Sequence, residues 1–149
     1  MDEKLVCVDA NIIVALVTFE VHSEKALALW SRWMREDFQV KAPFLLKCEV
    51  ASALRRKAAR GILSPEDARR CLEEALSLDI DYLDPPDLPL LAFDIATRFG
   101  LSTAYDAYYL GLAEILGCEL WTADEELFNA VREGFDKIKL LKDFDPAAE

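Results

Sequence analysis

The stretch Lys4-Leu-Val-Cys-Val-Asp9 is a short apolar run rich in β-branched residues, and a second apolar stretch follows it at residues 12–19. A run of this length and composition is typical of a strand buried inside a protein. We therefore expect a buried strand near the N-terminus, with Asp9 at its C-terminal end.

Beyond this strand, segments with strand character alternate with segments of helical period. Ser64-Pro65 marks the start of one helix, and Gly61, Gly100 and Gly117 each mark the end of another. Further strands are expected over residues 38–42 (stopped by Pro43), 80–83, 119–122 and 137–141, and helices from a Ser23 cap onward and over residues 45–60, 64–77, 90–99, 103–116 and 124–132. This alternation predicts the α/β class, with a mainly parallel sheet covered by helices on both faces. We expect one domain over residues 1–149, frayed from residue 145.

The composition is that of a folded globular protein, with 53% hydrophobic and 30% charged residues among 149. No apolar run reaches the roughly 18 residues of a membrane-spanning helix, and the N-terminus lacks the basic start of a secretory signal. We therefore expect a cytoplasmic protein. The four cysteines, Cys7, Cys48, Cys71 and Cys118, stand far apart in apolar stretches, and the one histidine is His22. We expect the cysteines to be reduced and buried, which argues against zinc or redox chemistry.

The chain is strongly acidic, with 28 Asp and Glu against 17 Lys and Arg and a formal net charge of −11. Such a charge repels RNA and DNA. An enzyme acting on nucleic acid would therefore need several of these acids to be neutralised by bound cations, or its basic residues to be concentrated on one face.

Two aspartates are predicted at the ends of strands. Asp9 and Asp124 both stand at strand-to-helix junctions, and in parallel sheets binding sites form beyond the carboxyl ends of the strands. Either aspartate could instead cap the helix that follows. Asn11 and Thr122, two positions away, could orient the carboxylates or cap the backbone locally.

Asp106 lies in a segment, residues 105–116, that is apolar almost all round. Its carboxylate is expected to be shielded from water, and a buried charge needs a hydrogen bond, a cation, a proton or a metal ion. The alternative is an acid in the first helical turn that bonds back to a Thr103 cap.

Glu49 lies at the edge of an apolar stripe, from which it can reach into a cleft. The alternative is an ordinary glutamate at the rim, paired with Arg56 or Lys57. With Asp9, Asp106 and Asp124 it would form an all-oxygen set, which is the ligand type that Mg²⁺ and Mn²⁺ prefer.

These residues occur in motifs that resemble the PIN domain, and most closely the VapC-like toxin ribonucleases of toxin–antitoxin pairs. The matching pieces, in the order of the family, are Val6-Cys-Val-Asp9-Ala-Asn11, Glu49-Val-Ala-Ser-Ala-Leu54, Thr103-Ala-Tyr-Asp106-Ala-Tyr-Tyr-Leu-Gly-Leu-Ala113 and Leu120-Trp-Thr-Ala-Asp124. The resemblance covers nearly the whole chain. It implies a three-layer α/β/α sandwich.

The same resemblance implies hydrolysis of RNA phosphodiester bonds with Mg²⁺ or Mn²⁺. The acids that correspond to metal-binding and catalytic residues of the family are Asp9, Glu49, Asp106 and Asp124, with Asn11 and Thr122 as supporting polar residues. Whether Glu125 takes part is open. Homodimerisation is also implied, as is inhibition by a small antitoxin that inserts side chains into the acidic groove.

The resulting hypothesis is a metal-dependent ribonuclease that acts as the toxin of a type II toxin–antitoxin pair. The RNA backbone could be held by Arg55, Arg56, Lys57 and Arg60, which could equally be a solvated helix end where cations suit the helix dipole. Core packing is expected for most of Trp30, Trp33, Phe38 and Phe44, and any exposed one could join an interface. The alternatives are a non-catalytic PIN-like module that binds RNA or protein, and a metal phosphohydrolase acting on another phosphate ester.

Overall fold

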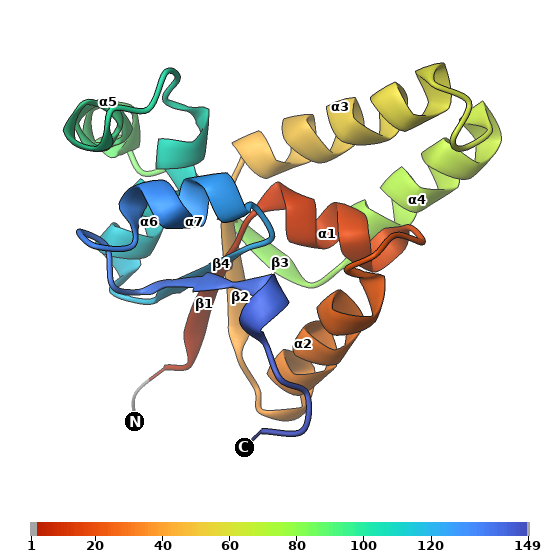
Figure 1. The fold of residues 1–149 in the computed structure, drawn as a ribbon, viewed down its shortest axis with the longest axis horizontal. Coiled ribbons are helices and arrows are strands. Elements are labelled where there is room, and N and C mark those ends of the chain that lie inside the picture. Colours follow the sequence, from red (N-terminus) through yellow and green to blue (C-terminus); the bar gives the residue numbers. More distant parts are fainter. Residues whose placement is uncertain (1–2, 149) are drawn as a thin grey trace.

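The fold is built on a parallel five-stranded sheet, seen in a computed structural model that describes residues 3–148 (Figure 1). Its strands lie in the order β3-β2-β1-β4-β5, and every neighbouring pair is parallel. The strands are β1 (Leu5–Val8), β2 (Gln39–Pro43), β3 (Ile80–Leu83), β4 (Glu119–Thr122) and β5 (Ile138–Leu140). The predicted parallel α/β architecture is therefore confirmed, with β1 at the centre of the sheet.

Helices cover both faces of this sheet. They are α1 (Ala10–Val17), α2 (Ser23–Arg35), α3 (Leu45–Ala59), α4 (Pro65–Ser77), α5 (Leu88–Phe99), α6 (Tyr105–Leu116) and α7 (Glu125–Val131), followed by a short 3₁₀ helix, η1 (Leu141–Asp143). Helix α1 packs against α2, α3 and α4, whereas α6 packs against α5 and strands β1, β2 and β4. Figure 1 shows α5 and α6 on one side of the sheet and α1 and α2 on the other, which confirms the three-layer arrangement.

Several element boundaries differ from the predictions by one or two residues. Ser64 does cap α4, since its hydroxyl accepts a hydrogen bond from the Asp67 N–H at 3.0 Å. Ser23 does not cap α2: His22 is the N-cap residue, and the Ser23 hydroxyl instead binds the preceding turn. Helix α5 begins two residues before the predicted position because Pro89 fits its first turn.

Gly100 and Gly117 end α5 and α6 in the left-handed backbone region, with φ of 67° and 68°. This region strongly favours glycine because it has no Cβ. Both helix ends were predicted from these glycines.

The interior is formed by the apolar faces of the sheet and the helices, and Val6, Cys7 and Val8 of β1 are all buried. The prediction of buried cysteines holds for Cys7 and Cys118 and is wrong for Cys48, which is exposed. Cys48 lies on α3 about half a turn from the stripe that faces the core, so it points to solvent.

Most of the four aromatic residues considered above pack in or against the core, as expected. Trp33 is buried, Trp30 and Phe38 are partly buried against the core, and Phe44 is half exposed. Residues 145–148 were predicted to be frayed. In the structure they are held against α2, because Arg32 donates hydrogen bonds to the carbonyls of Pro146 and Ala148. Residue 149 lies outside the described residues. No helix within residues 3–148 is long and apolar enough to cross a membrane.

Candidate active site

Two adjacent parallel strands bring Asp9 and Asp124 to the same edge of the sheet. Asp9 follows β1 and its N–H donates to the Trp121 carbonyl of β4 at 3.0 Å, while Asp124 lies two residues beyond the end of β4. Both aspartates are also N-caps: Asp9 Oδ1 accepts from the Ala10 N–H at 2.8 Å, and Asp124 Oδ1 accepts from the Leu127 N–H at 3.1 Å. Each cap uses one carboxylate oxygen, so the capping role leaves a second oxygen for other chemistry.

The second oxygen of Asp9 is held by the two supporting residues predicted for it. Asp9 Oδ2 accepts from the Thr122 hydroxyl at 2.8 Å and from the Asn11 amide at 3.2 Å. The Asn11 carbonyl oxygen in turn accepts from the Ala123 N–H at 2.9 Å, and the Thr122 hydroxyl oxygen accepts from the Asp124 N–H at 3.0 Å. This network connects β1 to β4 and fixes the orientation of Asp9.

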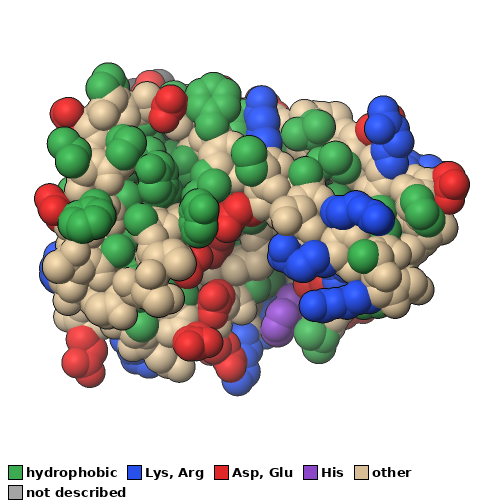
Figure 2. All heavy atoms as spheres, turned by 90° about the horizontal axis from the view of Figure 1, so that it is seen from above, with side chains coloured by type: hydrophobic (Ala, Val, Ile, Leu, Met, Phe, Trp, Pro, Cys, Tyr) green, Lys and Arg blue, Asp and Glu red, His purple; other side chains and the backbone are tan. Residues whose placement is uncertain are grey.

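Asp9, Glu49 and Asp106 line one cavity of about 300 Å³, although they come from the end of β1, from α3 and from α6. The other residues around it are Ala10, Asn11, Val14, Glu20, Ala53 and Arg56. Figure 2 shows acidic side chains in a hollow on this face, with basic side chains gathered to its right and hydrophobic ones to its left. Asp124 does not line the cavity, but its charge acts on Asp106.

Two acids of this cluster, Asp9 and Asp106, have raised pKa values. Burial is the main cause that raises the pKa of Asp9 from 3.8 to about 7, and the charges of Asp106 and Glu49 add to it. The Thr122 hydroxyl and the Ala10 N–H oppose the rise because they stabilise the carboxylate. The pKa of Asp106 is also raised, by burial first and then by Asp124 and Glu49.

No lysine or arginine within residues 3–148 forms an ion pair with any of these four acids. The cluster is therefore a concentration of negative charge that the described part of the chain does not compensate. Such a cluster either takes up protons or attracts a cation.

Glu49 has a partner that the sequence interpretation missed. The alternative, a rim glutamate paired with Arg56 or Lys57, is not found among the described residues: Arg56 donates to the Ser52 hydroxyl at 3.1 Å, and Lys57 pairs with Glu20 at 3.2 Å. Instead, the buried Tyr109 hydroxyl donates a hydrogen bond to Glu49 Oε1.

A signal for Tyr109 exists in the sequence. It lies one turn after Asp106 on the same apolar helix, and a buried phenol needs a hydrogen-bond acceptor. Glu20, which also lines the cavity, was not predicted either. It follows the end of α1 and belongs to no recognisable sequence motif.

Asp106 does not bond back to Thr103 as the alternative required. The N-cap residue of α6 is Ala104, which makes no capping hydrogen bond with its side chain. The Asp106 carboxylate is partly buried in the first turn of α6, so it remains directed to the shared cavity that it lines. Glu125 is engaged elsewhere, in an ion pair with Lys142 at 2.8 Å.

The donor chemistry of the cluster fits a divalent cation. Aspartate and glutamate oxygens are what Mg²⁺ and Mn²⁺ bind, and no histidine or cysteine is among the described residues that line the cavity. Within residues 3–148, no three acidic, histidine or cysteine side chains lie close enough together to form a preformed metal-binding site. Carboxylates repel one another, so a cation would have to draw them together.

The four basic residues predicted as possible RNA contacts, three near the end of α3 and Arg60 just after it, differ in their distance from the cavity. Arg56 lines the acidic cavity, and Lys57 stands beside it in the pair with Glu20. Arg55 and Arg60 are exposed.

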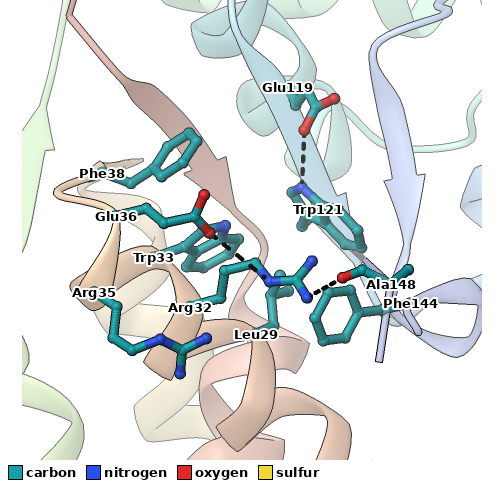
Figure 3. Close-up of a pocket in the computed structure, with 10 residues that line it drawn as sticks. All are labelled: Leu29, Arg32, Trp33, Arg35, Glu36, Phe38, Glu119, Trp121, Phe144 and Ala148. Atoms are coloured by element: carbon teal, nitrogen blue, oxygen red, sulfur yellow. Dashed lines mark hydrogen bonds and ion pairs between the residues drawn. The ribbon is translucent and has the colours of Figure 1, made fainter. Parts of the chain in front are cut away.

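A different cavity of about 560 Å³ lies between α2, β4 and the C-terminal segment (Figure 3). Aromatic side chains dominate it, with Trp33 and Trp121 packed edge to face at 6.5 Å between ring centroids. The Arg32 guanidinium lies over the Phe144 ring at 4.9 Å. None of the predicted site residues lines this cavity.

Comparisons with known proteins agree with this architecture. Ribonuclease VapC3 of Pyrobaculum aerophilum is 35% identical over 126 residues, covering 83% of this chain and 92% of that protein. The crystal structure of PAE2754 from Pyrobaculum aerophilum superposes with a TM-score of 0.68 at 26% identity, over 92% of this chain and 89% of the other.

A toxin–antitoxin complex from Klebsiella pneumoniae superposes with a TM-score of 0.62 at 17% identity, over 91% of this chain and 97% of the other, which shows a shared fold. The family model of the PIN domain matches residues 6–134, a range that includes Asp9, Glu49, Asp106 and Asp124. This chain belongs to the PIN domain family.

Proposed function

We propose that this protein is a ribonuclease that depends on Mg²⁺ or Mn²⁺ and serves as the toxin of a type II toxin–antitoxin pair. The observation that carries the proposal is the gathering of Asp9, Glu49 and Asp106 around one cavity, with no ion pair between them and a lysine or arginine of the described residues. The name of the relative Ribonuclease VapC3 supports RNA as the substrate.

In this proposal Asp9, Glu49, Asp106 and Asp124 hold the cation. Asp9 accepts more hydrogen bonds than the other three among the described residues, because its two oxygens accept from Ala10, Thr122 and Asn11. A bound divalent ion would lower the pKa of a water molecule and offset the charge of the phosphate. Asn11 and Thr122 act by keeping the Asp9 carboxylate in one orientation.

Arg56 is our candidate for the residue that holds an RNA phosphate at the cavity. It lines the cavity beside Glu49 and Asp106, and its one side-chain hydrogen bond among the described residues is to a neutral hydroxyl, that of Ser52. A guanidinium in this position can contact a phosphate oxygen and partly offset the net charge of −11. Lys57 would have to leave Glu20 to do the same.

The test is RNA cleavage by the purified protein. We expect cleavage with Mg²⁺ or Mn²⁺, none with EDTA, and loss of cleavage in Asp106→Asn with the fold intact by circular dichroism. Cleavage by Asp106→Asn at the wild-type rate would refute the proposal. Metal binding without RNA turnover would favour the non-catalytic module, and turnover of only a small phosphate ester would favour the other phosphohydrolase.

An antitoxin partner is supported by the Klebsiella pneumoniae neighbour, which was solved as a toxin–antitoxin complex. The acidic cavity suits a partner segment that carries a basic side chain, because such a side chain would neutralise Asp9 and Asp106 in place of a cation. Co-expression with the short reading frame next to the gene should yield a complex that does not cleave RNA.

We also propose a homodimer. Leu90 and Phe93, one turn apart on α5, are 74% and 65% exposed, and Tyr105 at the start of α6 is 59% exposed. Exposed apolar side chains on two helices that pack against each other are common at interfaces between subunits. Size-exclusion chromatography with light scattering should give the mass of two chains, and Phe93→Glu should give the mass of one.

A further inference from the structure

We infer that Tyr109 is a positioning residue that directs one oxygen of Glu49 to the metal ion and thereby favours a small divalent ion over Ca²⁺. This inference rests on the proposed metal site. It concerns a contact between α3 and α6 that lies beneath the acidic cavity.

The contact has three features that fit this role. The Tyr109 hydroxyl donates to Glu49 Oε1, its side chain is fully buried, and no other hydrogen bond or ion pair within residues 3–148 involves the Glu49 carboxylate. The phenol is neutral, so it fixes the carboxylate without neutralising it. A lysine or arginine at this place would compete with the metal ion for the charge of Glu49.

Tyr109 is also tied to a second acid of the cluster. It lies one turn after Asp106 on α6, so the two side chains share one face of the helix. The ring packed in the core therefore sets the distance between the α6 acid and the α3 acid. The charges of Asp9, Glu49 and Asp106 all act on the Tyr109 hydroxyl, which places it within their common field.

The consequence for the metal ion follows from carboxylate geometry. A carboxylate that binds an ion through both oxygens needs a lone pair of each directed at the ion, and the Tyr109 hydroxyl already uses one lone pair of Oε1 and fixes the direction of that oxygen. Oε2 keeps both of its lone pairs, so binding through this one oxygen is favoured over binding through both. Mg²⁺ takes single oxygens in a tight octahedron, whereas the larger Ca²⁺ takes six to eight oxygens and often both from one carboxylate. The hydrogen bond therefore favours Mg²⁺ or Mn²⁺.

The test compares Tyr109→Phe with Tyr108→Phe. Tyr109→Phe removes the hydroxyl and keeps the ring, so it opens no large cavity. Tyr108 is the neighbouring residue of α6, is partly buried and makes no side-chain hydrogen bond among the described residues, so it is a matched control. The binding constants of Mn²⁺ and Ca²⁺ are measured by titration calorimetry on full-length protein freed of metal with EDTA.

We expect Tyr109→Phe to weaken Mn²⁺ binding by about 10-fold or more and Ca²⁺ binding much less, so that the ratio of the two constants falls by about 10-fold. Tyr108→Phe should keep the wild-type ratio. With Glu49→Gln already present, adding Tyr109→Phe should have no further effect on Mn²⁺ binding, whereas a general loosening of the fold would still weaken it.

The outcomes separate the inference from the proposed function. If wild-type protein binds Mn²⁺ and Tyr109→Phe keeps the wild-type Mn²⁺ to Ca²⁺ ratio, the inference is wrong and the proposed function stands. If the Tyr109→Phe effect persists in the Glu49→Gln background, the role is structural and the inference is again wrong. If wild-type protein binds no Mn²⁺, the proposed metal site fails and the inference fails with it.

Discussion

Replacing Asp9 with asparagine should abolish cleavage and at the same time stabilise the metal-free protein. Asp9 is 4% exposed and stands among like charges, so its ionised form is disfavoured in the folded state. Asparagine has nearly the shape of a protonated aspartate and carries no charge. It therefore removes the electrostatic penalty and keeps the volume of the side chain, while its NH₂ group, which is a donor, no longer accepts hydrogen bonds as the replaced oxygen does.

The size of the gain follows from the pKa of Asp9. Its ordinary value of 3.8 and its folded value of about 7 lie about 3 pH units apart. Each unit of difference corresponds to about 1.4 kcal/mol. The folded state keeps the proton up to about pH 7, while the unfolded state releases it near pH 3.8. The free energy of unfolding of the wild type therefore falls by about 4 kcal/mol as pH rises between these values.

The assay is urea unfolding in EDTA, followed by tryptophan fluorescence at several pH values. Asp9→Asn should exceed the wild type by about 2 kcal/mol near pH 5 and by about 4 kcal/mol above pH 7. Asp94→Asn, an exposed site on α5, is the matched control and should change nothing. Addition of Mn²⁺ should stabilise the wild type and not Asp9→Asn, because the ion binds the folded wild type.

Two results would refute this reasoning. If Asp9→Asn is no more stable than the wild type at about pH 8, burial does not disfavour the carboxylate as the structure indicates. If the gain is the same at every pH, it does not come from ionisation.

Three further predictions concern neighbouring groups. Thr122→Val removes the hydroxyl that holds Asp9 at 2.8 Å, so RNA cleavage should fall by about 10- to 100-fold, and a wild-type rate would contradict the role of Thr122. Arg56→Gln should raise the KM for RNA several-fold. In binding titrations, the slope of log binding constant against log salt concentration should become less steep by about 0.7. An unchanged slope would exclude a phosphate contact. Leu110→Ala truncates a fully buried side chain of α6 and should lower the free energy of unfolding by about 2–5 kcal/mol, measured with urea; a loss below about 1 kcal/mol would mean that the site collapses around the smaller residue.

Much of the fold could be predicted because its signals are local. The apolar run before Asp9, the Ser64-Pro65 start of α4 and the glycines that end α5 and α6 each depend on a few neighbouring residues. The parallel orientation of the strands then follows from the alternation of strands and helices. Because strand ends of a parallel sheet share one edge, the amino-acid sequence alone predicts that Asp9 and Asp124 lie on the same side of the molecule.

Contacts between distant elements could not be predicted in the same way. The only partners that the sequence suggested for Glu49, in the alternative interpretation, were its neighbours Arg56 and Lys57 on α3, but those side chains contact Ser52 and Glu20. The actual partner, Tyr109, is 60 residues away and reaches Glu49 only because α6 packs against the sheet next to α3. Such a pairing depends on the packing of whole helices, which helical period alone does not specify.

The distribution of charge matters more for this protein than its total. The net charge of −11 opposes RNA binding when it is averaged over the surface. However, Asp9, Glu49 and Asp106 hold part of that charge inside one cavity, and Arg56 borders the same cavity. The burial that raises the pKa of Asp9 also places this carboxylate in a low dielectric, where a divalent cation would be attracted more strongly than at the surface. The acids that make the folded chain less stable without metal are then the groups that would give it affinity for the ion, and through the ion for a phosphate.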